Sequence, residues 1–250
     1  MAQTSDTRLV VTLPIYNDTR FLGSTAVMLE EATKPIEKRF TLLVAEDGSN
    51  SSATIDELKW KYQNLVHLQH DQRLGRGKAL RDAWSQIKAD VYVYVDVDLA
   101  TDLDSFDAYR NLILLQNQFD LVTGSRYITG AVINRPTLRK ATSIAYNWLV
   151  RLLFHTGVHD HQCGFKSFSR QLVERLAVEA RSDSWFWDTE VIVLARRMGF
   201  RVKEIPVLWT EKKGHRTPLK RLLRDMWLHG SGLLVLFYRA YFSDLRRTLS

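Results

Sequence analysis

Two aspartates, Asp96 and Asp98, stand one residue apart directly after the apolar run VYVYV at positions 91–95. Carboxylates at this spacing can face a hard divalent cation together, and Mg²⁺ or Mn²⁺ held there could bridge a diphosphate. The sequence shows no structural partner for either side chain. We therefore expect two unpaired carboxylates at the end of a buried strand, where they call for a cation.

Other polar residues follow predicted strands or form short motifs. Asp47 opens the turn Asp-Gly-Ser after a second apolar run, and its carboxylate could accept hydrogen bonds from a base or ribose. The stretch Gly-Arg-Gly-Lys at 75–78 lacks the upstream glycine and the Ser/Thr of a P-loop. A plain turn and a diphosphate contact from Arg76 or Lys78 both stay open. The lone Cys163 is expected to pack in the core rather than act as a nucleophile.

The elements around these residues predict an α/β fold. Apolar runs at 8–15, 40–45, 65–69 and 91–95 read as strands, and helical segments follow at 19–32, 52–62 and after the glycine-rich loop up to about residue 87. Such alternation predicts βαβ units and an open, mostly parallel sheet flanked by helices. Ligands of such sheets bind beyond the carboxyl ends of the strands, where the loops at 14–18, 46–49 and 96–98 would lie.

The end of the chain combines positive charge with large apolar side chains. The formal net charge of the chain is +7. Between Glu211 and Ser250 there are nine basic and three acidic residues, interleaved with Trp227 and several Leu, Phe and Tyr residues. This composition suits an amphipathic helix at a membrane surface, although an ordinary docking helix with a basic face is an alternative. We expect residues 1–210 to form the catalytic domain and 211–250 a basic amphipathic segment packed on it and facing the membrane.

Composition also bounds the location of the protein. A chain of 250 residues with 45% hydrophobic content can bury a substantial core. One cysteine excludes an internal disulfide and favours a reducing compartment. The amino-terminal residues lack the pattern of a signal peptide, and the apolar runs are too short to span a bilayer. A cytoplasmic protein attached peripherally to the cytosolic face of a membrane is expected.

Seven short motifs occur in a fixed order and resemble one family of enzymes. The motifs are LPIYN at 13–17, DGS at 47–49, GRGKA at 75–79, DVDLA at 96–100, GSR at 124–126, QCGFK at 162–166 and WDTE at 187–190. The series resembles the inverting family-two glycosyltransferases of the GT-A fold, and within them the dolichyl-phosphate mannose and glucose synthases. The resemblance covers residues 9–234, nearly the whole chain.

The resemblance implies a role for each matching residue. It implies that the nucleotide sugar contacts Pro14, Tyr16, Asn17, Asp47, Lys78 and Asp96, and that Asp96 and Asp98 hold Mg²⁺ or Mn²⁺. It implies a lipid-phosphate site of Arg126, Arg139, Ser143 and Arg216, and a catalytic set of Asp98, Asp96 and Arg126. Asp188 and Glu190 would position the donor sugar or an arginine, although they could also simply start a helix.

The activity implied by the resemblance is transfer of a hexose, with inversion, from a UDP- or GDP-sugar to dolichyl or polyprenyl phosphate. Glucose is favoured over mannose because the motif at 162–166 is closer to that of the glucose synthases. Two alternatives stay open: a family-two transferase that acts on a sugar or protein hydroxyl, and a non-enzymatic basic protein that binds membrane or nucleic acid. The carboxylates at strand ends favour the enzyme, so no nucleic-acid partner is expected.

Overall fold

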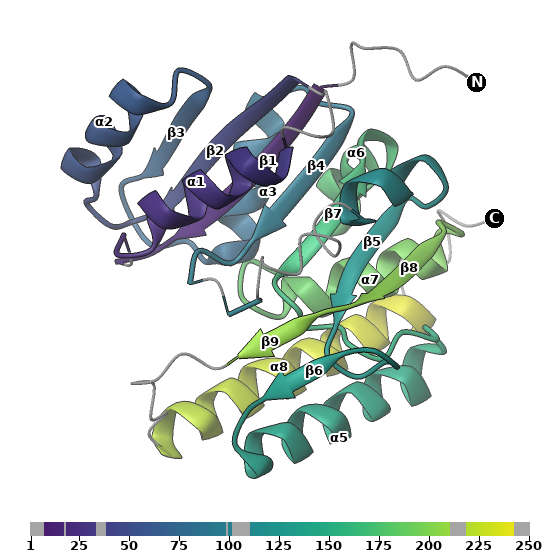
Figure 1. The fold of residues 1–250 in the computed structure, drawn as a ribbon. Coiled ribbons are helices and arrows are strands. Elements are labelled where there is room, and N and C mark those ends of the chain that lie inside the picture. The colour runs from purple at the N-terminus through teal and green to yellow at the C-terminus, as the bar shows by residue number, and fades with distance from the viewer. Residues whose placement is uncertain are drawn as a thin grey trace.

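In the part of the chain that the structure describes, seven strands form one central sheet (Figure 1). The computed structural model describes residues 8–17, 19–33, 39–98, 100–101, 111–210 and 219–242, with only the backbone at 32, 33, 39, 52 and 219–223. In sheet order the strands are β3 (Leu65–His70), β2 (Arg39–Asp47), β1 (Arg8–Ile15), β4 (Val91–Val95), β7 (Phe165–Ser169), β5 (Leu121–Ser125) and β8 (Val202–Pro206).

The sheet confirms the expected α/β fold with mostly parallel strands. β3, β2, β1 and β4 are parallel neighbours, and β5 pairs with β8 in parallel. β7 is antiparallel to both of its neighbours, β4 and β5, so those two strands run in the same direction. The run VYVYV is buried along its whole length, as its continuous apolar character predicts.

Helices cover both faces of the sheet. They are α1 (Leu22–Thr33), α2 (Ser52–Lys61), α3 (Arg76–Gln86), α6 (Arg170–Glu179) and α7 (Trp187–Arg197). Alternation along β1 explains the two layers: Leu9, Val11 and Leu13 pack with α1 and α2, whereas Val10 packs with α3, α6 and α7. Figure 1 shows α1 in front of the sheet and α3 behind it.

Two long helices, α5 (Thr137–Phe154) and α8 (Leu219–Phe242), lie side by side at the end toward which β5 points (Figure 1). A third apolar cluster joins them to α7 through Val150, Phe154, Val193, Leu233 and Leu236. The short parallel strands β6 (Val132–Asn134) and β9 (Leu208–Thr210) lie nearby, and a 3₁₀ turn, η2 (Leu115–Asn117), precedes β5.

None of the helices in the described ranges is long and apolar enough to cross a membrane.

Candidate active site

The candidate residues gather at one edge of the sheet. β1, β2 and β4 are parallel neighbours, so their carboxyl ends meet there, with Ile15 opposite Glu46. β5 runs in the same direction, and its following residue is Arg126. β7 runs the other way, so its first residue, Phe165, pairs with Val95 at this edge. The loops after β1, β2, β4 and β5 and the loop before β7 therefore surround one place.

Asp96 lies at the centre of this edge. Its side chain is 34% exposed, and its Oδ1 accepts a hydrogen bond of 2.6 Å from Arg76 Nη1. Its backbone N–H donates to the carbonyl of Gly164 at 2.9 Å. A Cβ added at Gly164 would lie 1.9 Å from Asp96 Oδ2, so only glycine leaves room for this carboxylate. Gly164 of the QCGFK motif thus packs directly against the Asp96 side chain.

Arg76 connects Asp96 to helix α7. Its side chain is 7% exposed and also pairs with Asp188, while its guanidinium carbon lies 3.8 Å from the ring centroid of Trp185. The expectation that Asp96 is unpaired is therefore wrong for the protein alone. No sequence pattern links the two residues, because Arg76 begins α3 and Asp96 follows β4, and only the folded sheet brings them together.

A buried polar network surrounds Asp188, which is 1% exposed. One oxygen accepts hydrogen bonds from Tyr94 and from Lys166 Nζ, the latter at 2.9 Å, and the other pairs with Arg76. Burial lowers the pKa of Lys166 to about 7. Burial also raises the pKa of Asp188 to about 6, against the pull of Arg76. Asp188 thus contacts an arginine, one of the two roles expected for it.

Asp98 lies on the same loop, half-buried, and its Oδ1 accepts a hydrogen bond of 3.0 Å from the N–H of Ala100. Thr25 of α1 donates to the carbonyl of Val97 at 3.0 Å and so fixes the loop between the two aspartates. Across the described ranges, no three His, Cys, Asp or Glu residues converge on one point. Two carboxylates fit Mg²⁺ or Mn²⁺, which commonly take their other ligands from substrate phosphates and water.

The loop after β1 places Tyr16 at the surface. Tyr16 is 40% exposed, and the guanidinium carbon of Arg73 lies 4.0 Å from its ring centroid. Asn17 is exposed and adopts a φ of 53°, in the left-handed region that asparagine tolerates. Pro14 is half-buried within β1. An exposed aromatic ring beside an arginine can stack on a base, so these positions remain predicted nucleotide contacts.

Asp47 is already occupied by backbone donors. It is 5% exposed, and its carboxylate accepts hydrogen bonds from the N–H groups of Leu74 at 2.7 Å and Gly75 at 2.9 Å. It therefore shapes the loop that presents Arg76. Lys78, in the first turn of α3, donates a hydrogen bond of 2.6 Å to Asp82 Oδ1 and is partly exposed. Contacts of Asp47 and Lys78 with a nucleotide remain predictions.

Arg126 is held by a partner that the sequence did not reveal, Asp160. Its Nε and Nη2 bond the two oxygens of Asp160 at 2.6 and 2.9 Å, and its backbone N–H bonds the same carboxylate at 3.0 Å. Burial alone would lower the pKa of Arg126, but Asp160 outweighs it and raises that pKa. Asp160 stands in no recognisable motif, and only the folded loop could reveal it.

A second residue that the sequence did not reveal, Arg135, contacts one of the predicted phosphate-binding residues. Its Nη1 donates to Ser143 Oγ at 3.0 Å. Burial lowers the pKa of Arg135, and the nearby charges of Arg126 and Arg139 lower it further. Three arginines and Ser143 therefore form one positive group beyond β5. Arg216, the fourth predicted contact, lies outside the described residues.

Glu190, the other predicted sugar-positioning residue, holds backbone and an arginine in this structure. It is 2% exposed and accepts hydrogen bonds from the N–H groups of Arg181 at 3.1 Å and Ser182 at 2.7 Å. Arg239 of α8 donates to it at 2.7 Å. Cys163 is buried, and burial raises the pKa of its thiol to about 12, which suits packing rather than reactivity.

Comparison with known proteins gives matches over most of the chain. The family model for glycosyl transferase family 2 matches residues 10–177. The glycosyltransferase AglD of Haloferax volcanii is 39% identical over 90% of this chain, which covers 36% of the length of AglD. The dolichyl-phosphate beta-glucosyltransferase ALG5A of Trichomonas vaginalis is 28% identical over 86% of this chain and 70% of its own length.

A solved structure has the same fold at low sequence identity. It is glucosyl-3-phosphoglycerate synthase from Mycobacterium tuberculosis in complex with Mn²⁺, UDP and phosphoglyceric acid. The TM-score is 0.68 at 16% identity, over 95% of this chain and 80% of that one. Identity this low supports the fold alone. The nucleotide and metal in that complex belong to that protein.

Proposed function

Because the chain belongs to glycosyl transferase family 2, we propose that it transfers a hexose, with glucose favoured, from a UDP- or GDP-sugar to dolichyl or polyprenyl phosphate. One observation carries this proposal: Asp96 and Asp98 follow β4, and the arginine group beyond β5 lies at the same edge of the sheet. Carboxylates suit a cation and a diphosphate, whereas arginines suit an anionic acceptor. The names of the dolichyl-phosphate glucosyltransferase relatives agree with a lipid phosphate and glucose.

The proposed reaction is a single in-line displacement. An acceptor phosphate oxygen forms a bond to C1 of the sugar while the bond from C1 to the nucleoside diphosphate breaks, which inverts an α-linked donor to a β-linked product. The acceptor phosphate has a second pKa of about 6 and is already largely dianionic at neutral pH, so it needs no general base. A cation between Asp96 and Asp98 would stabilise the charge on the departing diphosphate.

In this scheme each charged group has a separate task. Arg126, Arg135 and Arg139 attract and orient the acceptor phosphate, because a guanidinium can donate two hydrogen bonds to one phosphate. Asp160 fixes the orientation of Arg126 through its two side-chain hydrogen bonds. Arg76 and Asp188 keep the Asp96 carboxylate in place. The residues thus bind and orient two anionic substrates rather than move protons.

The test is a transfer assay with a panel of donors. Purified protein is incubated with Mn²⁺, a polyprenyl phosphate and each of several UDP- and GDP-sugars, and the lipid product is extracted and identified. We expect one hexose to pass to the lipid phosphate and the product to be β-linked. Transfer to an added sugar or peptide hydroxyl, with none to the lipid phosphate, would favour the alternative acceptor.

Exchange of Arg139 for alanine tests the acceptor site. Loss of charge-assisted hydrogen bonds worth about 1.5–3 kcal/mol should reduce transfer to lipid phosphate by roughly 10- to 100-fold. Binding of the nucleotide sugar should not change, because Arg139 lies on α5, away from the loops after β1 and β2. R175A removes an exposed arginine from α6 and serves as the control. Unchanged lipid turnover in R139A would count against this acceptor site.

We also propose that α5 and α8 attach the protein peripherally to a membrane. Exposed apolar side chains run along both helices: Leu138, Trp148, Leu149 and Leu152 on α5, and Met226, Trp227, Leu234, Val235, Tyr238 and Phe242 on α8. The two helices are neighbours, and we propose that these side chains form one joint apolar surface. A surface of this kind, combined with basic residues, suits the headgroup region of a bilayer.

Two tryptophans on this surface allow a controlled test. Trp148 is 57% and Trp227 75% exposed. Each buries apolar area worth about 1.5–3 kcal/mol when inserted, so W148A/W227A should reduce vesicle binding at least about tenfold. W60A is the control, because Trp60 is 91% exposed but lies on α2, away from α5 and α8. Wild-type protein that stays wholly in the supernatant with anionic vesicles would defeat the attachment proposal.

A further inference from the structure

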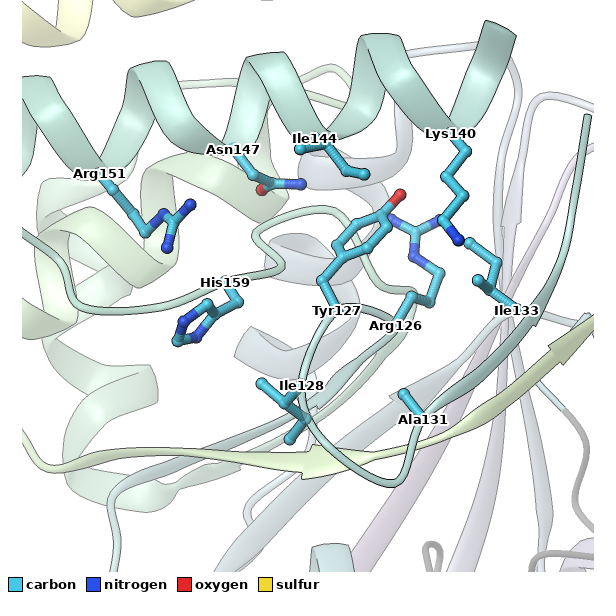
Figure 2. A pocket seen from close by; sticks show the side chains of 10 residues that line it. All are labelled: Arg126, Tyr127, Ile128, Ala131, Ile133, Lys140, Ile144, Asn147, Arg151 and His159. Atoms are coloured by element: carbon cyan, nitrogen blue, oxygen red, sulfur yellow. The ribbon is translucent and has the colours of Figure 1, made fainter. Parts of the chain in front are cut away.

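A cavity of about 390 Å³ lies between α5 and the loop that follows β5 (Figure 2). Its lining is Arg126, Tyr127, Ile128, Ala131, Ile133, Lys140, Ile144, Asn147, Arg151 and His159. Among these, Arg126 alone belongs to the predicted active-site residues. In Figure 2, Arg151 and His159 stand at one end and Lys140 and Arg126 at the other, with Tyr127 between them.

The lining contains four basic side chains and no acidic one. The charge of Arg126 is balanced by Asp160, and His159 Nδ1 lies 2.9 Å from Glu204 Oε2. Lys140 and Arg151 therefore give the cavity its positive charge. The Nε atom of Arg151 is buried and has no hydrogen-bond partner in the described part of the chain. A buried guanidinium donor of this kind requires an acceptor, and phosphate oxygens fit it well.

The cavity adjoins the proposed membrane surface. A helix turns about 100° per residue, so Lys140, Ile144 and Arg151 share one face of α5, and Trp148, Leu149 and Leu152 occupy the next face around. That next face is the exposed apolar one. When it lies in the interface of a bilayer, the cavity opens at the depth of the lipid headgroups.

We propose that this cavity binds an anionic phospholipid headgroup, whose phosphate pairs with Arg151 at one end of the cavity, while Lys140 adds a second positive charge at the other end. The proposal rests on the membrane attachment proposed above. The isoleucines at 128, 133 and 144 would cover the apolar part of the headgroup region. The predicted acceptor ligands Arg139 and Ser143 lie on the opposite side of the Lys140 face from Trp148. The third, Arg126, stands at the Lys140 end of the cavity, so the acceptor phosphate would lie away from a headgroup phosphate at Arg151.

Binding of a soluble phospholipid tests the cavity without a bilayer. Dihexanoyl phosphatidylglycerol below its micelle concentration is titrated into the full chain by calorimetry, with dihexanoyl phosphatidylcholine for comparison. We expect phosphatidylglycerol to bind more tightly, and K140A/R151A to weaken it at least about tenfold. K59A/K61A removes the same charge from exposed positions on α2 and should bind as the wild type does. Equal loss in both double variants, or no loss in K140A/R151A, overturns the proposal.

Two further measurements separate the sources of the phosphate. If inorganic phosphate binds as tightly as dihexanoyl phosphatidylglycerol, the cavity is a free-phosphate site and the lipid assignment is wrong. If K140A/R151A raises the KM for a short-chain polyprenyl phosphate in detergent about tenfold, the cavity belongs to the acceptor instead. Thermal melting checks folding, and K140A alone, at an exposed position, replaces the double variant if that variant melts early.

The failure of this proposal can be distinguished from that of membrane attachment. Protein that binds dihexanoyl phosphatidylglycerol through Lys140 and Arg151 but does not sediment with vesicles would refute attachment and leave the cavity assigned. Protein that sediments equally with neutral and anionic vesicles, and whose binding K140A/R151A does not alter, would refute the cavity and leave attachment in place.

Discussion

Exchange of Asp96 for asparagine is expected to reduce hexose transfer at least about a thousandfold. Asp96 lies at the centre of the sheet edge, and the amide would keep an oxygen that can accept from Arg76 but would remove the negative charge that a cation needs. The effect should therefore appear in catalysis and metal binding rather than in folding. The measurement is transfer from the donor identified in the panel, together with electron paramagnetic resonance of Mn²⁺ in the presence of UDP or GDP.

Asp90 offers a matched control at the other end of the same strand. It precedes β4, pairs with Arg170 at 2.9 Å and is 42% exposed. D90N removes the same charge but should leave transfer within about twofold of the wild type, because an exposed ion pair contributes at most about 1 kcal/mol. If D96N keeps normal transfer, or if its Mn²⁺ signal equals that of the wild type, the assignment of the metal site is wrong.

Exchange of Asp188 for alanine should produce the largest loss of stability. The side chain is buried and contacts Arg76, Lys166 and Tyr94. Its removal leaves the buried Lys166 without a carboxylate and leaves Arg76 with Asp96 alone. Loss of one partner of a buried ion pair costs about 3–5 kcal/mol. We expect the free energy of unfolding, measured by urea denaturation, to fall by about that amount.

The nearby pair of Asp183 and Arg81 provides the comparison. Asp183 is 54% exposed, and surface pairs of this kind contribute about 1 kcal/mol or less. D183A should therefore change the unfolding free energy by less than about 1 kcal/mol. A similar small loss in D188A would mean that water reaches Asp188 and that the network is not the buried one described here.

Much of the fold could be predicted because the first four strands are recognisable from the local order of apolar and polar residues. β1, β2, β3 and β4 are apolar, β-branched runs, and the helices between them follow the spacing of βαβ units. β7 was not predicted, because its sequence FKSFS contains a lysine and two serines. Lys166 can lie in a central strand only because Asp188, Tyr94 and the carbonyl of Cys163 receive its ammonium group.

The candidate site was predicted in its residues but not in its contacts. The sequence predicts Asp96 and Asp47 at strand ends, and the structure has them there. It gave no sign that Arg76 pairs with Asp96 or that Asp160 pairs with Arg126, because the two residues of each pair are 20 and 34 positions apart in the sequence. Only a folded sheet shows which loops meet.

The structure adds contacts that the motifs do not indicate. Asp47, a predicted nucleotide contact, also accepts hydrogen bonds from the N–H groups of Leu74 and Gly75. No separate role was predicted for Gly164 of the QCGFK motif, yet its lack of a side chain leaves the room that the Asp96 carboxylate needs. Spacing in a sequence identifies residues that matter more readily than it identifies the neighbour each one touches.

The antiparallel strand β7 also sets the order in which the molecule can be completed. β4 and β5 both pair with β7, whose residues are 165–169, so the edge that each of them presents to β7 stays unpaired until those residues have left the ribosome. β5 then also lacks its other partner, β8, so one edge of β4 and both edges of β5 are open to any other chain in reach. Asp188 emerges later still, so Arg76, next to Asp96, acquires its second partner only after residue 188 has been made.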